Sequence, residues 1–110
     1  MEVRDSYADP GRINKQLRKA IEANIERRAK VRYASHYRNG KVYEGYLEAT
    51  YENGFTFMVD RGYRHFISYV DLYCKAVTLE QGAANTDVRA AISKIRAETV
   101  FSIPLVASMV

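Results

Sequence analysis

Few side chains in this sequence of 110 residues are of the types that carry out chemistry. His36, His65 and Cys74 are the only imidazole and thiol groups, and they do not form the closely spaced Cys and His pairs of structural zinc sites. A single cysteine at an alternating strand position is usually a small buried apolar residue and not a nucleophile. We therefore predict a protein that is not an enzyme, with no catalytic residues, no metal and no cofactor.

Cations and aromatic rings form the stronger pattern. The net charge is +4, and the segment from Arg12 to Arg38 holds nine Lys or Arg against two acidic residues. Cations that hold phosphates, beside tyrosines that stack on bases, are typical of proteins that bind single-stranded nucleic acid. The residues predicted to bind nucleic acid or an acidic partner are Lys15, Arg18, Lys19, Arg27, Arg28, Lys30, Arg32, Tyr33, His36, Tyr37, Arg38 and Arg64.

A plainer interpretation of the same residues stays open. Charge runs often only solvate a helix end and one face of a strand. Tyrosine is also common in cores and at protein interfaces, so the rings need not face a nucleic acid.

The first element that must position these residues is a helix. Asp9 and Pro10 suit a helix start, because a carboxylate can cap free backbone N–H groups and proline fits the first helical position. Apolar residues then recur at steps of three and four, which predicts a basic amphipathic helix over residues 11–28. Arg27 and Arg28 are expected at its C-terminal end, where cations interact favourably with the helix dipole.

From Lys30 the period changes to the alternation of a strand. Asn39-Gly40, Asn53-Gly54 and Arg61-Gly62 then predict tight turns, the first two with positive φ at both central residues. Together they divide residues 30–79 into five short antiparallel strands, the last running from Tyr73 to Leu79 after a helical turn at 69–71. Gly45 lies in the long second strand, where we expect a sharp bend.

The C-terminal part is predicted to hold a short helix over residues 86–97, followed by an apolar tail over 99–110. The tail carries no charge after Glu98, so it is expected to cover its own barrel or to pair with a second copy in a homodimer. The residues predicted for this protein interface are Phe101, Ile103, Leu105 and Val106.

The fold class that results is mainly β with flanking helices in a single domain, 1–110. Its middle, over residues 30–79, is expected to be a strongly bent, five-stranded antiparallel barrel, since the order of helix, meander, short turn and last strand is that of small Sm-like and SH3-like barrels. The strand Tyr43-Glu44-Gly45-Tyr46-Leu47 and the run from Phe66 to Leu72, within residues 31–79, resemble the Veg family of small Gram-positive bacterial proteins. The resemblance implies an Sm/SH3-like barrel and says more about fold than about activity. The paired aspartate and asparagine with which Sm proteins hold RNA bases are missing after the strand from Phe55 to Asp60.

Two functional hypotheses follow, with an uncharacterised enzyme a distant third. The first is a nucleic-acid-associated binding or regulatory protein. The second is a protein-binding inhibitor from a phage or mobile element that blocks a nucleic-acid-binding host enzyme, such as a defence nuclease. The average hydrophobic share, 47%, and the lone cysteine favour a soluble protein of the reducing cytoplasm, with no membrane partner.

Overall fold

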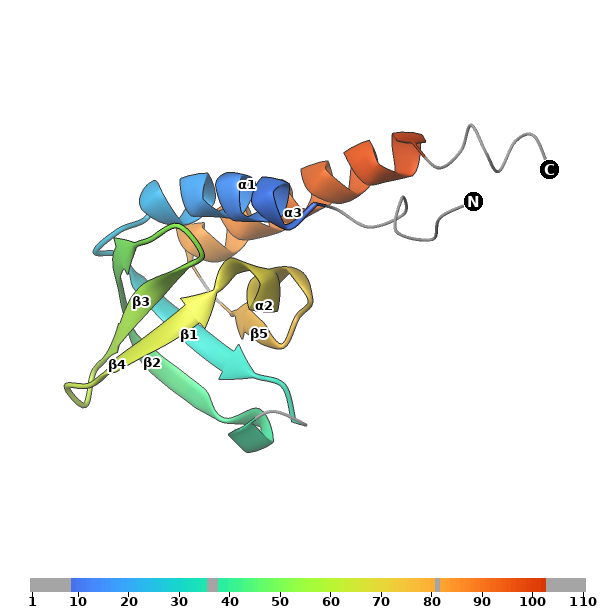
Figure 1. Cartoon of the computed structure of the whole chain (residues 1–110). Coiled ribbons are helices and arrows are strands. Elements are labelled where there is room, and N and C mark those ends of the chain that lie inside the picture. Colours follow the sequence, from blue (N-terminus) through green and yellow to red (C-terminus); the bar gives the residue numbers. More distant parts are fainter. Residues whose placement is uncertain (1–8, 36–37, 81, 103–110) are drawn as a thin grey trace.

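The computed structural model describes residues 9–35, 38–80 and 82–102 (Figure 1). The elements, in chain order, are α1 (Pro10–Glu22), β1 (Arg28–Tyr33), a short 3-10 turn (Arg38–Gly40), β2 (Val42–Thr50), β3 (Gly54–Val59), β4 (Arg64–Ser68), α2 (Tyr69–Tyr73), β5 (Val77–Leu79) and α3 (Ala83–Ser102). No helix in this described part of the chain has the length and apolar character that a bilayer crossing requires.

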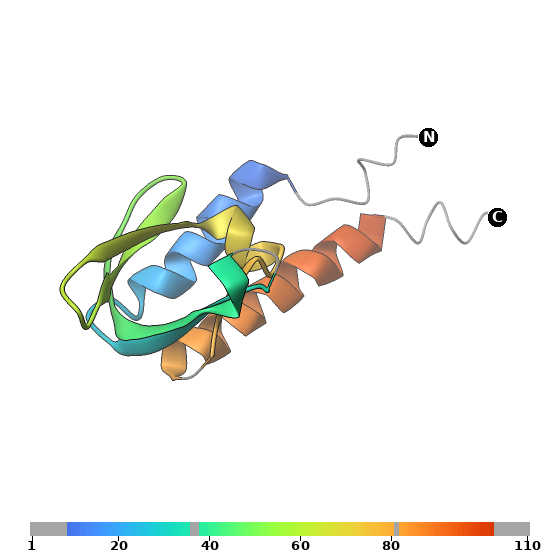
Figure 2. The same cartoon turned by 90° about the horizontal axis from the view of Figure 1, so that it is seen from below.

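The strands form one antiparallel sheet in the order β4-β3-β2-β1-β5. This confirms five antiparallel strands with flanking helices. The hydrogen-bonded sheet is open, however, because the described residues of β4 and β5 lie at its two edges and do not pair with each other. The predicted barrel closure is therefore not observed. Figures 1 and 2 show a strongly curved sheet, with α1 and α3 side by side on one side of it.

The core lies between the curved sheet and the two helices. Ile13, Leu17 and Ile21 of α1 are buried, as the apolar periodicity predicts. Two polar contacts join the helices: Arg12 forms an ion pair with Glu98, and the Asn24 amide donates to Asp87 Oδ2 at 2.8 Å. Since these contacts join opposite ends of the two elements, α1 and α3 run antiparallel.

The helix predicted over 11–28 ends at Glu22. The Asn24 side chain, 1% exposed, donates to the carbonyl of Ala20 at 2.8 Å and so occupies an acceptor near the helix end. Glu26 then takes a positive φ of 72°, and its N–H donates to the Leu47 carbonyl of β2. The chain thus leaves the helix to join the sheet.

This early end corrects the expected place of two cations. Arg28 is the first residue of β1, and Arg27 precedes it in the connection. Neither lies at the C-terminal end of α1, so neither interacts with the helix dipole there.

Gly45 permits a close approach of β2 to β3. A Cβ built at this position would lie 1.9 Å from the Met58 carbonyl oxygen, far inside van der Waals contact. Between Leu47 and Ala49 the pairing of β2 with β3 also shifts register. Glycine is therefore required at this position for a steric reason, and the irregularity of β2 lies at Leu47–Ala49 and not at Gly45, where the bend was predicted.

Two Asn-Gly pairs behave differently. Asn39 and Gly40 have φ of 56° and 67°, as a type I′ turn requires. A tight turn does join β2 to β3 at this place, where the Tyr51 N–H donates to the Gly54 carbonyl at 2.7 Å, but Asn53 and Gly54 have no positive φ, so only the predicted turn conformation is wrong. Gly54 instead begins β3, where a Cβ would lie 2.4 Å from the Ile67 carbonyl oxygen of β4.

The predicted strand 73–79 is shorter than expected. Residues up to Tyr73 belong to α2, whose N-cap Ser68 accepts a hydrogen bond from the Asp71 N–H at 3.1 Å. Cys74 follows this helix and is exposed, so its expected burial on a strand is wrong.

The C-terminal helix α3 extends beyond the predicted range 86–97 at both ends. It takes in residues 99–102, which the sequence assigns to the apolar tail. Ile103, Leu105 and Val106 lie outside the described residues, as does the side chain of Phe101.

Candidate nucleic-acid interface

Three of the predicted arginines are held in bidentate ion pairs with carboxylates of other strands or connections, and the pair of Arg64 in β4 with Glu48 in β2 spans the intervening strand β3. The Arg28 guanidinium donates to both oxygens of Asp60 at 2.6 Å. Arg64 donates to both oxygens of Glu48, at 2.6 and 2.8 Å. The paired forks match carboxylate geometry, and they leave fewer donors for a phosphate.

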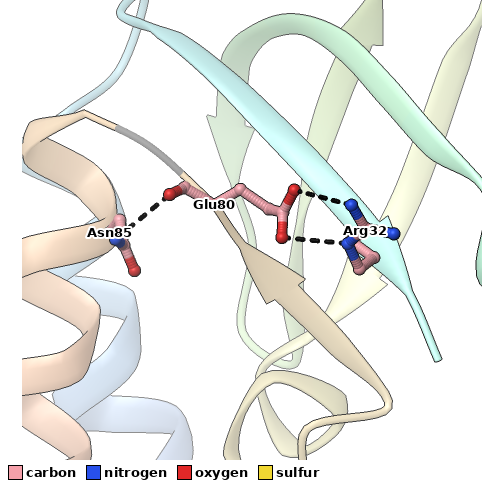
Figure 3. Close-up of polar contacts among 3 residues, drawn as sticks. All are labelled: Arg32, Glu80 and Asn85. Carbon is pink, nitrogen blue, oxygen red and sulfur yellow. Dashed lines mark hydrogen bonds and ion pairs between the residues drawn. The ribbon is translucent and has the colours of Figure 1, made fainter.

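Arg32 forms the third pair, with Glu80 at the end of β5 (Figure 3). Its Nε and Nη2 donate to the two carboxylate oxygens at 2.9 and 3.2 Å. The Asn85 amide of α3 donates to the Glu80 main-chain oxygen at 3.4 Å, so one residue connects β1 to the start of α3. This arrangement favours a structural role for Arg32.

The ion pairs change the protonation equilibria of the carboxylates. Hydrogen bonds from the arginines lower the pKa of Asp60, of Glu48 and of Glu80 below their usual values. The same bonds raise the pKa values of the arginines. The three arginines and Asp60 are exposed, while Glu48 and Glu80 are half-buried. Solvent therefore screens each pair, and its contribution to stability is small.

The predicted cations of α1 remain more available. Lys15 and Lys19 are exposed and make no ion pair within the described ranges, whereas Arg18 lies 3.4 Å from Glu22. These residues border a hollow of about 440 Å³, whose lining is Gly11, Asn14, Lys15, Arg18, Lys19, Glu22 and Glu52.

Two aromatic residues that were not predicted as binding residues lie beyond this hollow. Tyr51, 51% exposed, precedes Glu52, and Phe66 of β4 is 58% exposed. Their ring centroids are 6.4 Å apart. Alternation in β4 places Ile67 in the core and Phe66 outside, but the sequence alone does not say which of the two apolar neighbours is buried.

Tyr33 was predicted to be an exposed stacking residue and is 3% exposed, so this prediction is wrong. The ring faces the concave side of the curved sheet, where its hydroxyl lies 2.8 Å from His65 Nδ1. Tyr43 and Tyr63 complete an aromatic cluster around His65, with ring centroids 4.7 and 5.3 Å from the imidazole.

The other predicted residues divide into two groups. Arg27 is exposed and Lys30 half-buried, and neither forms an ion pair in the described part of the chain. His36 and Tyr37 lie outside the described residues, as does the side chain of Arg38.

Among the residues that are described, no three His, Cys, Asp or Glu side chains gather as metal ligands.

The residues predicted to form one binding surface therefore fall into separate groups. They are the paired arginines of the sheet, the cations of α1, and Tyr33 in the core. Comparison with family models, with curated proteins and with solved structures finds no match for this chain.

Proposed function

We propose that this protein binds single-stranded nucleic acid, without catalysis, through a surface that we term the basic–aromatic face. It consists of Lys15, Arg18, Lys19, Tyr51 and Phe66. The observation that carries the proposal is the pair of exposed rings in mutual contact, of which Tyr51 is next in the chain to Glu52. Glu52 lines the same hollow as Lys15 and Lys19, which have no ionic partner among the described residues.

Several contacts support placing these residues on one side of the molecule. The Asn14 amide donates to Asn53 Oδ1 at 3.2 Å, which fixes α1 beside the β2–β3 turn. Thr50 donates to Glu22 at 3.0 Å on the same side. Glu52, the neighbour of Tyr51 in the chain, lines the hollow that Lys15 and Lys19 border.

The chemistry of the face suits a flexible strand. Ammonium and guanidinium groups hold phosphates, and bases stack on rings whatever their sequence. Glu22 and Glu52 lie among the cations and reduce the local positive potential, so stacking carries a large share of the affinity. The proposal is accordingly a binder with little sequence preference and a modest dependence on salt.

Replacement of the two rings tests the proposal. Tyr51→Ala with Phe66→Ala removes the stacking surface and should weaken binding of a labelled single-stranded oligonucleotide by roughly ten-fold or more, at about 1–3 kcal/mol per stacked base. The matched control is Tyr51→Phe with Phe66→Tyr, which keeps both rings and should keep the affinity. Equal fluorescence anisotropy curves for the alanine variant and the native protein would contradict the proposal.

A second candidate function is binding to a protein, as in the inhibitor hypothesis. It is favoured by the edge strand β4, where alternate residues direct their main-chain groups away from β3: Arg64, Phe66 and Ser68. An extended segment of a partner can add to such an edge. This function would be favoured over the first if the protein captures a nucleic-acid-binding enzyme, and if replacement of Phe66, but not of Lys15 or Lys19, abolishes the capture.

For the fold, we infer an Sm/SH3-like barrel that is open between β4 and β5, in keeping with the Veg resemblance. Support comes from the Tyr33 hydroxyl of β1 and the His65 imidazole of β4, which meet at 2.8 Å although these strands are not neighbours in the sheet. Such a contact requires the sheet to curl most of the way around.

A further inference from the structure

A second hollow lies where the β3–β4 turn faces the start of β2. Its volume is about 540 Å³, within the range of about 300–1,000 Å³ that is usual for small-molecule sites. The lining residues are Lys41, Val42, Tyr43, Glu44, Val59, Asp60, Arg61 and Tyr63. None of them belongs to the basic–aromatic face.

The turn that forms one wall of this hollow is held in place by several bonds. The Gly62 N–H donates to the Val59 carbonyl at 2.8 Å, and Gly62 takes a φ of 97° that favours glycine. The Asp60 N–H donates to the Glu44 carbonyl at 2.9 Å, while the Asp60 side chain is held by Arg28. The wall is thus built by main-chain contacts between strands.

The aromatic side of the hollow is also supported from behind. Tyr43 and Tyr63 lie edge to face, with centroids 6.5 Å apart and an interplanar angle of 84°. His65 contacts both rings and is itself within hydrogen-bond distance of the buried Tyr33 hydroxyl. Tyr63 is 42% exposed, so part of its ring is available to a ligand.

The charges at the mouth are of two kinds. Lys41 and Arg61 are exposed cations that form no ion pair within the described ranges. Glu44 supplies an exposed carboxylate, whereas both oxygens of Asp60 already accept from Arg28. The hollow therefore combines two available cations, one available carboxylate and an aromatic surface.

We propose that this hollow binds a nucleoside phosphate. The base lies against Tyr63, Lys41 and Arg61 hold the phosphate, and the Glu44 carboxylate accepts hydrogen bonds from ribose hydroxyls or an exocyclic amino group. A free nucleotide and the phosphorylated end of a strand share this chemistry. The site is separate from the basic–aromatic face, so it does not depend on the function proposed for that face.

The test is an NMR titration of the isotope-labelled full chain with adenosine monophosphate, adenosine and inorganic phosphate as separate probes. We expect saturable shifts of backbone amides in 41–44 and 59–63 with adenosine monophosphate, and much weaker binding of either fragment. Phosphate binding as tightly as the nucleotide would overturn the proposal, as would shifts confined to other residues or none at all. Repeating the titration with a 5′-phosphorylated and an unphosphorylated oligonucleotide distinguishes the two ligands. Tighter binding of the phosphorylated oligonucleotide supports a strand terminus. Equal binding of both oligonucleotides, with adenosine monophosphate still bound, supports a free nucleotide.

Two variants place the ligand. Lys41→Gln with Arg61→Gln should weaken nucleotide binding by about ten-fold or more, because the two lost charge-assisted contacts with the phosphate are together worth at least one such factor. Lys15→Gln with Lys19→Gln is the matched control on α1 and should leave nucleotide binding unchanged. An unchanged affinity in the first variant, with its amide spectrum still that of the folded protein, would refute the site. Loss of oligonucleotide binding in the control variant alone would concern only the basic–aromatic face.

Discussion

Two hydrogen bonds from one guanidinium set the protonation equilibrium of Asp60. The bidentate contact with Arg28 lowers the Asp60 pKa in the folded protein. A lowered folded pKa means that the pair stabilises the fold above the unfolded value of about 3.9, and that this stabilisation is lost as the pH falls through the folded pKa. Its loss therefore belongs to the acid range below about pH 4.

Arg28→Gln tests this assignment. The variant should raise the Asp60 pKa towards its usual value, measured by the carboxyl carbon shift in an NMR pH titration. Arg27→Gln, which removes a neighbouring exposed cation without an ion pair in the described structure, should leave the Asp60 titration nearly unchanged. If Arg28→Gln and Arg27→Gln give the same Asp60 titration as the native protein, the ion pair does not form in solution.

Gly45 makes a second prediction at the level of one residue. Gly45→Ala places a methyl group against the Met58 carbonyl, so β2 and β3 must separate, at a cost of about 1–3 kcal/mol in the free energy of unfolding. Gly11→Ala, in the exposed first turn of α1, is the control and should be neutral or slightly stabilising. Urea denaturation of both variants checks the prediction. Equal midpoints for native protein and Gly45→Ala would mean that the strands do not approach this closely.

One buried amide contributes to the connection between α1 and α3. Asn24→Ala leaves the Ala20 carbonyl and the Asp87 carboxylate without this donor, and we expect a loss of about 1–3 kcal/mol of stability. Asn85→Ala removes a longer, half-buried bond to Glu80 and should cost less. Thermal melts of both variants check this prediction, and equal losses of stability in the two variants would contradict it.

Local sequence patterns predict those helices and strands whose positions depend on interactions between residues close in the chain. The period of Ile13, Leu17 and Ile21 predicts α1 correctly, and the turn signals divide the sheet into the right number of strands. The end of α1 could not be predicted, because the Asn24 amide is held by Asp87, 63 positions along the chain. Gly54 likewise serves an approach between strands and not the turn that Asn-Gly suggests.

The candidate site was harder to predict for the same reason. Arg28 and Asp60 are 32 positions apart, so only the register of the sheet brings them together. Tyr33 follows the alternation that should have indicated its burial, since its partner at the same face, Val31, is also buried. Phe66 is an apolar residue on the exposed face of an edge strand, and no local pattern distinguishes it from a core residue.

At the scale of the whole molecule, the two regions for which we propose binding of nucleic acid or nucleotide are separate on the described surface. The basic–aromatic face combines α1 with the β2–β3 turn and β4. The hollow proposed to bind a nucleotide lies at the β3–β4 turn and the start of β2. Arg28, Arg32 and Arg64 of the sheet are paired with carboxylates, and they supply no free cation to either region.

The dependence of oligonucleotide affinity on salt tests the central claim most directly. With phosphates held by Lys15, Arg18 and Lys19, the logarithm of the association constant should fall against the logarithm of salt concentration with a slope of roughly −2, at about −0.7 for each phosphate of a single strand. Lys15→Glu with Lys19→Glu should make the slope shallower, at about −1 or closer to zero, and should weaken binding. Arg89→Glu, the reversal of an exposed cation on α3 outside both regions, should change neither. The account is contradicted if the native protein shows no salt dependence, or if the Lys15 and Lys19 variant keeps the native slope.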